Sequence, residues 1–339
     1  MKTTAQRWYI KFLQWKTQYL THRQFILLLC VLVGVATGFA ALAMRSLTHF
    51  IEEVLVGNII RYINYGFYVV FPAVGFLLVY LVKKYVIRKD VSHGIPSILY
   101  AVAKQKGIMK RFQAYGSLLT APITIGFGGS VGLEGPMVVT GAGISSQIAR
   151  LFHINQSDRM LLLACACAAA LAAIFKVPLA GILFAIEVFG LDLTLWSLLP
   201  LFVASLSGVL ISYLFFGNAA LLPIQVSGSF LMRNIPFYLL LGVVGGFMSA
   251  YFTFVYEWVN RFFARFSSPY VRLLIGGAVL GLLVFLMPPL YGEGHEVINH
   301  LKEGHPELSL GDNIFGWDLH NPWIIILLLV GLAFSKVVA

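Results

Sequence analysis

Residues 126–136 read Gly-Phe-Gly-Gly-Ser-Val-Gly-Leu-Glu-Gly-Pro, and they decide what kind of fold the chain can form. The glycines remove side-chain bulk, so backbone N–H groups can face a ligand. Pro136 suits the first turn of a following helix, which would place Glu134 at a helix N-terminus, where anions are attracted. Because apolar residues flank the stretch, it predicts non-helical backbone at membrane depth, which persists only where protein or a water-filled cavity satisfies it.

The composition of the chain supports a membrane environment. Of its 339 residues, 59% are hydrophobic and 11% are charged, whereas a soluble domain carries about 25% charged residues. The mean hydropathy is +0.85, and the chain has 32 glycines. Glycine is more frequent in transmembrane helices than in soluble ones. These values exclude a soluble cytosolic enzyme and predict an all-α polytopic membrane protein.

The charged residues form clusters that alternate with apolar spans. The chain has 24 Lys and Arg against 14 Asp and Glu, which gives a net charge of +10. Basic residues gather in residues 1–24 and 83–111, whereas residues 291–320 are mainly acidic. The positive-inside rule places the two basic segments in the cytoplasm and the acidic segment outside. The basic excess therefore indicates membrane topology and not nucleic-acid binding, and residues 1–24 are expected to form a cytoplasmic amphipathic helix.

Long apolar runs stand on both sides of a region of shorter ones. Between residues 92 and 200 the apolar pieces are broken by glycine and proline, which is typical of the discontinuous helices at transporter and channel binding sites. The last run stops without a loop or cap, so we expect a truncated sequence. Full membrane spans are expected at residues 25–43, 66–82, 198–216, 237–259, 271–286 and 322–334.

Glu134 is the first candidate for a functional residue. A carboxylate at bilayer depth costs roughly 2.5–3.5 kcal/mol on insertion scales, so such a residue usually faces a pore or a partner. The alternative is a buried ion pair with a distant helix, because the nearest basic residues in the sequence are Arg111 and Arg150. At a helix N-terminus that attracts anions, the carboxylate would act as a tethered competitor for the anion.

Ser130 supports a second hypothesis from another class. Residues 128–132 match the G-x-S-x-G pattern of serine hydrolases. That chemistry needs a strand before the serine, for which residues 118–125 are suitable by composition, and a base such as His93. An intramembrane serine hydrolase therefore remains as an alternative, although a chain of membrane spans cannot build the α/β sheet of that fold.

Four other features have a structural interpretation, and one of them, His93, has a functional one as well. His93 is either hydrogen-bonded in a loop or a donor to an anion whose charge responds near neutral pH. Glu187 is expected to cap or pair at a cytoplasmic helix end, and residues 291–296 are expected to be a solvated outer loop. Cysteines occur only in apolar runs and at no zinc spacing, so they are expected to pack as small residues; they are Cys30, Cys165 and Cys167.

With these motifs in order along the chain, the sequence resembles the CLC family of chloride channels and chloride/proton exchangers. Residues 128–136 resemble the family's G-x-x-x-G-x-E-G-P element and residues 92–96 its G-S-G-I-P element. Residues 176–187 resemble the helix that comes next in the family, and residues 291–294 the later outer-loop pattern. The resemblance implies a CLC-type inverted-repeat helical bundle with broken half-helices, with a first membrane repeat at residues 25–216 and a partial second repeat at residues 217–339.

By this resemblance, Glu134 is the gating glutamate, which blocks the anion path when ionised and clears it when protonated. Half-helix N-termini would hold the anion, and each carries about half a positive charge. The implied anion-binding residues are His93, Gly94, Ile95, Gly132, Leu133 and Gly135.

The chain also departs from the family pattern at four points. His93 replaces the anion-coordinating serine, and Leu133 replaces a basic residue that often precedes the gate. Val188 stands where proton-coupled members have a second glutamate, which leaves Glu187 as the candidate for an internal proton relay. The family's G-x-F-x-P element and its anion-coordinating tyrosine would lie beyond Ala339.

The sequence therefore predicts a chloride channel or transporter with a glutamate gate, channel-like or weakly proton-coupled. A chloride/proton or fluoride/proton antiporter is the alternative within the same family. We expect no enzymatic activity, catalytic residue, cofactor or metal site. The expected partners are chloride or a similar small anion, the lipid bilayer, a second copy of the chain in a homodimer and, where coupling exists, protons. A prokaryotic inner membrane is the expected location.

Overall fold

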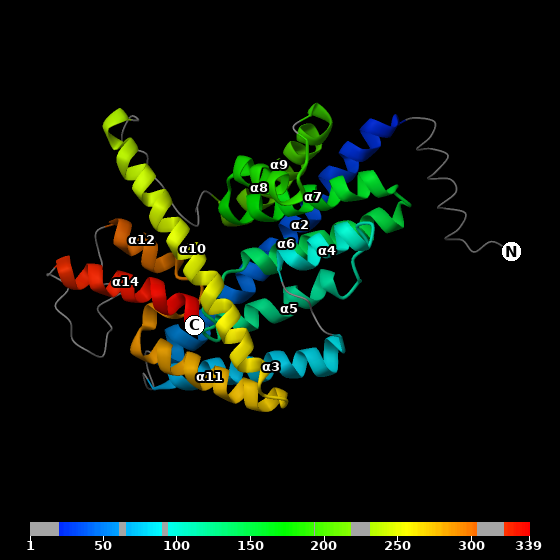
Figure 1. Cartoon of the computed structure of the whole chain (residues 1–339). Coiled ribbons are helices and arrows are strands. Elements are labelled where there is room, and N and C mark those ends of the chain that lie inside the picture. Colours follow the sequence, from blue (N-terminus) through cyan, green and yellow to red (C-terminus); the bar gives the residue numbers. More distant parts are fainter. Residues whose placement is uncertain (1–19, 61–65, 90–93, 193, 218–230, 304–321) are drawn as a thin grey trace. The chain divides into compact units, whose positions relative to one another are not determined.

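The computed structural model describes residues 20–60, 66–89, 94–192, 194–217, 231–303 and 322–339 (Figure 1). In these ranges the chain folds into helices joined by turns and loops, with no strand, as the sequence predicts. The expected N-terminal helix and His93 lie outside the described residues. The chain divides into two compact units, each made of segments that are separate in the sequence. The repeat boundaries expected at residues 25–216 and 217–339 stay a prediction.

Six helical segments in the described part are long and apolar enough to cross a membrane. Five of them contain the spans expected before residue 300. The sixth, α7, falls in the region expected to hold only broken pieces, and it runs unbroken because it contains neither glycine nor proline. The six are His22–Gly57, Phe67–Ile87, Gln156–Phe175, Leu195–Phe216, Met232–Ala264 and Pro269–Leu286.

The first unit comprises residues 1–47, 83–121 and 133–221. Its centre is α7 (Gln156–Phe175), which packs against α6 (Glu134–Leu151), α8 (Pro178–Phe189) and α9 (Leu195–Phe216). It also contains α4 (Ile95–Lys104) and most of α2 (His22–Glu52) and α5 (Gln113–Gly126).

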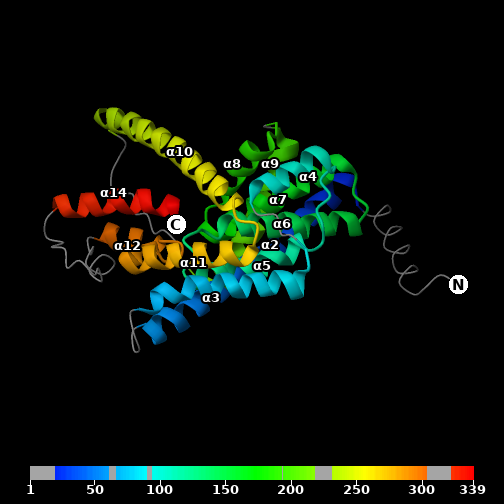
Figure 2. The ribbon, with the colours of Figure 1, turned by 60° about the horizontal axis from the view of Figure 1, so that its bottom comes forward.

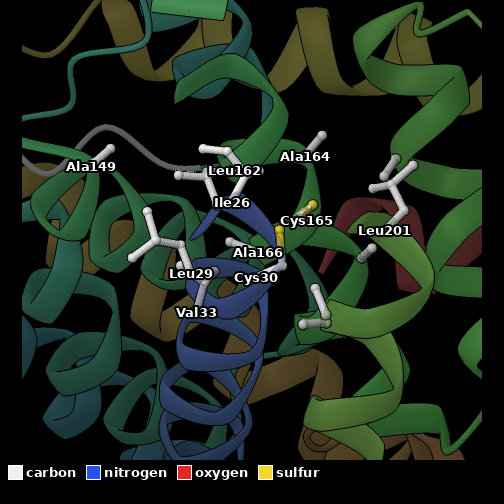
Figure 3. Close-up of a cluster of buried hydrophobic side chains, with 14 of the residues drawn as sticks. Ile26, Leu29, Cys30, Val33, Ala149, Leu162, Ala164, Cys165, Ala166 and Leu201 are labelled. Atoms are coloured by element: carbon white, nitrogen blue, oxygen red, sulfur yellow. Dashed lines mark hydrogen bonds between the residues drawn. The ribbon is translucent and has the colours of Figure 1, made fainter. Parts of the chain in front are cut away.

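Small side chains let the helices of the first unit approach α7 closely. Residues 164–170 of α7 are all alanine or cysteine and are fully buried. A Cβ atom added to Gly208 of α9 would lie 2.8 Å from the carbonyl oxygen of Ala169, so only glycine fits there. Cys30 of α2 and Cys165 of α7 are free thiols whose Sγ atoms lie 3.7 Å apart in this core (Figure 3). The cysteines thus pack as small residues.

The second unit comprises residues 48–82, 122–132 and 222–339. Its helices α3 (Phe67–Leu81) and α11 (Pro269–Leu286) lie side by side (Figures 1 and 2). A Cβ atom on Gly277 would lie 2.7 Å from Cα of Ala73, which shows how closely the two helices pack. The unit also contains α10 (Ile235–Ala264), α12 (His295–Glu303) and α14 (Pro322–Val338).

Short segments complete the described structure. Two are π-helical, η1 (Glu53–Ile60) after α2 and η2 (Val82–Ile87) after α3. Two are 3-10 turns, η3 (Met232–Asn234) before α10 and η4 (Pro288–Leu290) after α11. Tyr291 and Gly292 follow the η4 turn and lie at the core of the second unit.

Candidate functional site

Helix α6 begins at Glu134, as the sequence predicts. Leu133 occupies the N-cap position without a side-chain cap, and the N–H of Met137 donates to the carbonyl of Leu133 over 2.9 Å. Pro136 lies in the first turn, where the missing N–H group of proline removes no hydrogen bond of the helix. A half-buried carboxylate therefore lies at the positive end of the helix dipole.

Helix α4 starts in a similar way at the second predicted element. Gly94 is its N-cap residue, with φ +81° and ψ −179°, a conformation that side chains rarely adopt. Gly94 has no side chain to cap this end, and the first turn contains Pro96. Both the N–H and the Oγ of Ser97 donate to the Gly94 carbonyl, over 3.2 and 2.8 Å. Ile95, half-buried, is the first residue of the helix.

The starts of α4 and α6 meet within the first unit. A Cβ atom on Gly135 would lie 3.9 Å from Cα of Gly94, so the starts of the two helices lie close together. Each helix N-terminus carries about +0.5 of an elementary charge on the N–H groups of its first turn. The arrangement therefore brings two positive helix ends and the Glu134 carboxylate to one place, which suits a small anion.

The chain makes a tight turn at the end of α5, within the segment 122–132 of the second unit. Gly128 has φ +93°, and the N–H groups of Gly128 and Gly129 donate over 2.8 Å to the carbonyls of Ile125 and Thr124. These bonds fold the chain back at the end of α5. Residues 130–133, including the candidate Gly132, connect this turn to α6.

The serine-hydrolase hypothesis fails its structural requirement at this turn. The residues before Ser130 form helix α5 and not the strand that a nucleophile elbow needs. Ser130 is 5% exposed, and its hydroxyl has no hydrogen-bond partner among the described residues. No base therefore reaches Ser130 in the part of the chain that the structure describes.

Glu187 lies in the last turn of α8, and its side chain is exposed. A carboxylate near a helix C-terminus is not stabilised by the helix dipole. The residue that caps the end of α8 is not Glu187 but Gly190, whose φ of +58° lies in the left-handed region. Among the described residues Glu187 has no ion pair, so its role as a proton relay stays a prediction. Val188 next to it is half-buried and has no titratable group.

Two residues near these elements were not identified from the sequence. Lys176 ends α7 in the left-handed conformation, and its Nζ donates to the carbonyl of Gly217 over 2.6 Å at the end of α9. Tyr291 donates its hydroxyl proton to the carbonyl of Gly126 over 2.5 Å. The position of Lys176 directly before Val177-Pro178 gives some indication of its contact with Gly217. No local sequence pattern indicates the contact of Tyr291 with Gly126.

The expectation of a solvated loop at residues 291–296 is wrong except for the last residue, Glu296, which is exposed. Gly292 is buried, and the side chains of Glu293 and His295 are each 18% exposed. They pack because the carbonyl of Gly292 accepts a hydrogen bond of 2.7 Å from Nζ of Lys336 in α14. The segment is therefore part of the second unit's core.

Comparison with known proteins identifies the family. The model of the voltage gated chloride channel family matches residues 74–339. A putative chloride channel protein ClcB-like of Ralstonia nicotianae is 26% identical over 308 residues, which cover 86% of this chain and 67% of that protein. The H(+)/Cl(−) exchange transporter ClcA of Citrobacter koseri is 26% identical over 299 residues, which cover 84% of this chain and 63% of that protein.

Solved structures agree with the fold. A slow cyanobacterial Cl−/H+ antiporter superposes with a TM-score of 0.72 at 18% identity, over 94% of this chain and 73% of that one. A CLC-type fluoride/proton antiporter gives a TM-score of 0.70 at 22% identity, over 94% of this chain and 77% of that one. The chain spans about two thirds of the length of the two curated relatives. It is an integral, multi-pass membrane protein, and it belongs to the CLC family of voltage gated chloride channels.

Proposed function

We propose that the chain conducts chloride or a similar small anion through a path that Glu134 opens and closes. The observation that carries the proposal is the meeting of two helix N-termini at Gly94 and Gly135, with Glu134 as the first residue of α6. Backbone N–H groups and helix dipoles bind an anion without a fixed positive side chain. Gly94, Ile95, Gly132, Leu133 and Gly135 are the proposed anion-binding positions, together with His93.

Glu134 and the transported anion would compete for the same positive helix end. The ionised carboxylate occupies the anion position and closes the path, whereas the protonated carboxyl group is released from it. Anion entry and protonation of Glu134 are therefore linked, because each disfavours the closed state. Acid should increase the anion flux by this mechanism.

Coupling to protons is proposed to be weak. A proton that crosses from the cytoplasm needs titratable groups in relay, and Val188 cannot bind one. An exchanger is the second candidate, because the names of several relatives and structural neighbours describe chloride/proton or fluoride/proton exchange. In that case Glu187, one residue away from Val188, would have to replace the missing carboxylate.

A paired flux measurement tests both parts of the proposal. Liposomes that contain the protein are loaded with chloride, and anion efflux and proton movement are recorded together between acid and neutral pH. We expect efflux that rises with acid, with little stoichiometric proton movement. Glu134→Gln and Glu134→Ala should both conduct at neutral pH with the pH response largely abolished. Well-folded variants that keep the wild-type pH response would remove Glu134 as the gate.

Two further proposals rest on the family resemblance. The protein is proposed to form a homodimer in which each subunit has its own path, which the mass of the detergent-solubilised protein would test. Its proposed location is the inner membrane of a prokaryote, in keeping with the bacterial relatives.

A further inference from the structure

Tyr291 joins the segment after α11 to the turn that precedes the gate. Its hydroxyl donates to the carbonyl of Gly126 over 2.5 Å, although 165 residues separate the two in sequence. Burial, with Glu52 and Tyr68 nearby, raises the pKa of Tyr291, so the phenol keeps its proton and remains a donor. Tyr291, Gly126, Glu52 and Tyr68 all belong to the second unit.

The ring of Tyr291 also lies against the same turn. A Cβ atom added to Gly128 would lie 2.8 Å from Cε2 and 3.0 Å from Cδ2 of the ring, which leaves no room for a side chain. Gly128 has φ +93°, so its backbone conformation requires glycine as well. The turn therefore contacts Tyr291 twice, once through the hydroxyl and once through the ring.

Tyr291 and the adjacent Gly292 also contact three other elements of the second unit. The ring of Tyr68 in α3 packs edge-on at a centroid distance of 5.6 Å. Lys336 of α14 donates to the carbonyl of the adjacent Gly292 over 2.7 Å. A Cβ atom on Gly292 would lie 2.7 Å from Oε1 of Glu52, so this carboxyl group also lies against the backbone there. Tyr291 thus has little freedom to follow the turn if the turn moves.

We propose that Tyr291 is a positioning residue for Glu134: it fixes the turn at residues 126–129, and residues 130–133 transmit that position to the start of α6. The inference rests on the proposed function of Glu134 as the gate. The closed state needs the carboxylate at the helix N-terminus, so it depends on where the preceding turn releases the chain. Loss of the Tyr291 hydrogen bond should destabilise the closed state and leave the open state little changed.

The size and direction of the effect can be derived from the loss of one neutral hydrogen bond, which typically changes an equilibrium constant by a factor of about 2 to 10. In Tyr291→Phe, anion efflux at neutral pH should rise by about that factor relative to the efflux at acid pH. A less stable closed state favours the protonated form of Glu134. The midpoint of acid activation should therefore move to higher pH, by up to about one unit.

Tyr251→Phe is the matched control. Tyr251 of α10 also donates its hydroxyl to a backbone carbonyl of another helix in the second unit, that of Phe334, over 3.4 Å. In the described part of the chain, no hydrogen bond joins its side chain to residues 126–129. Both variants remove one hydroxyl group and keep the ring, so both should fold. We expect the pH profile to move in Tyr291→Phe and to stay in place in Tyr251→Phe.

The double variant Tyr291→Phe/Glu134→Gln separates positioning from a purely structural role. If Tyr291 acts through Glu134, adding Tyr291→Phe to Glu134→Gln should not change the flux or its pH dependence. Other ionisable groups around Tyr291 are Glu52, Tyr68, Glu293, Glu296, His295 and Lys336. If they set the pH profile, Tyr291→Phe would still shift it in the Glu134→Gln background, and the inference would be wrong.

The outcomes also separate this inference from the proposed function. If Glu134→Gln alone keeps the wild-type pH response, the gate proposal fails and the inference fails with it. If Glu134→Gln abolishes the response but Tyr291→Phe leaves the profile of the wild type unchanged, only the positioning role is refuted. A profile that moves equally in Tyr291→Phe and Tyr251→Phe would also refute it, because the shift would then not depend on the turn.

Discussion

Helices α7 and α10 are both apolar enough to span a membrane, but their surroundings differ. In the described structure, 72% of the most apolar stretch of α7 is buried, against 6% for the span that contains α10. Gly181 and Gly208 of neighbouring helices pack against the small residues of α7. A Cβ atom added to Gly242, Gly245 or Gly246 of α10 would meet no atom within 4 Å among the described residues outside the local helix backbone. Hydropathy therefore identifies a membrane span but not the helices that pack against it. A small residue indicates close approach of two helix backbones only where the structure shows contacts at that residue.

The largest effect should come from a bulky side chain in the α7 core. Gly208→Leu would push into the carbonyl of Ala169, and overpacking commonly costs about 1–3 kcal/mol, or more where the backbone cannot move. Gly245→Leu on α10 is the matched control and should retain the yield and melting temperature of the wild type. Size-exclusion profiles and thermal unfolding in detergent measure both. Equal losses of yield and melting temperature in the two variants would show that α7 and α10 do not differ in how closely they are packed.

A smaller loss of stability is expected when a buried hydroxyl group is removed from the first unit. Ser146 of α6 is fully buried, accepts from the N–H of Met109 over 2.8 Å and donates to the carbonyl of Gly107 over 3.1 Å. Ser146→Ala leaves that N–H without this partner, at a cost of about 1–3 kcal/mol. Thermal unfolding in detergent should show the loss as a lower melting temperature.

The control for Ser146→Ala is Thr253→Ala on α10. The hydroxyl of Thr253 bonds only within its own helix, to the carbonyl of Ser249, and the residue is exposed. We expect its melting temperature to stay near that of the wild type. A larger loss in Thr253→Ala than in Ser146→Ala would show that α10 is the more tightly packed helix.

The smallest effect is expected at Glu187. Its side chain is exposed on α8, and it has no ion pair in the described part of the chain. Glu187→Gln should leave stability, anion flux and proton movement unchanged in the liposome assay. Uphill proton transport driven by a chloride gradient, present in the wild type and lost in this variant, would instead place the relay at Glu187.

Much of the fold could be predicted from the sequence because local patterns specify it. Apolar runs located five of the six spans, and glycine next to proline marked the starts of α4 and α6. The continuity of α7 was missed because neighbouring Gly-Pro elements suggested short pieces on both sides of it. The contact of Tyr291 with Gly126 could not be predicted, since it joins segments far apart in the sequence and depends on how α11 packs against α3.

The central claim is that ionised Glu134 and the anion compete for the N-terminus of α6, and anion affinity measured against pH tests it most directly. Chloride binding to the purified protein is titrated by calorimetry at several pH values between acid and neutral. The wild-type affinity should rise as the pH falls and protonation removes the competing carboxylate. Glu134→Gln should bind chloride more tightly than the wild type at neutral pH, with no dependence on pH. A well-folded Glu134→Gln variant whose chloride affinity keeps the wild-type value and pH dependence would contradict the claim.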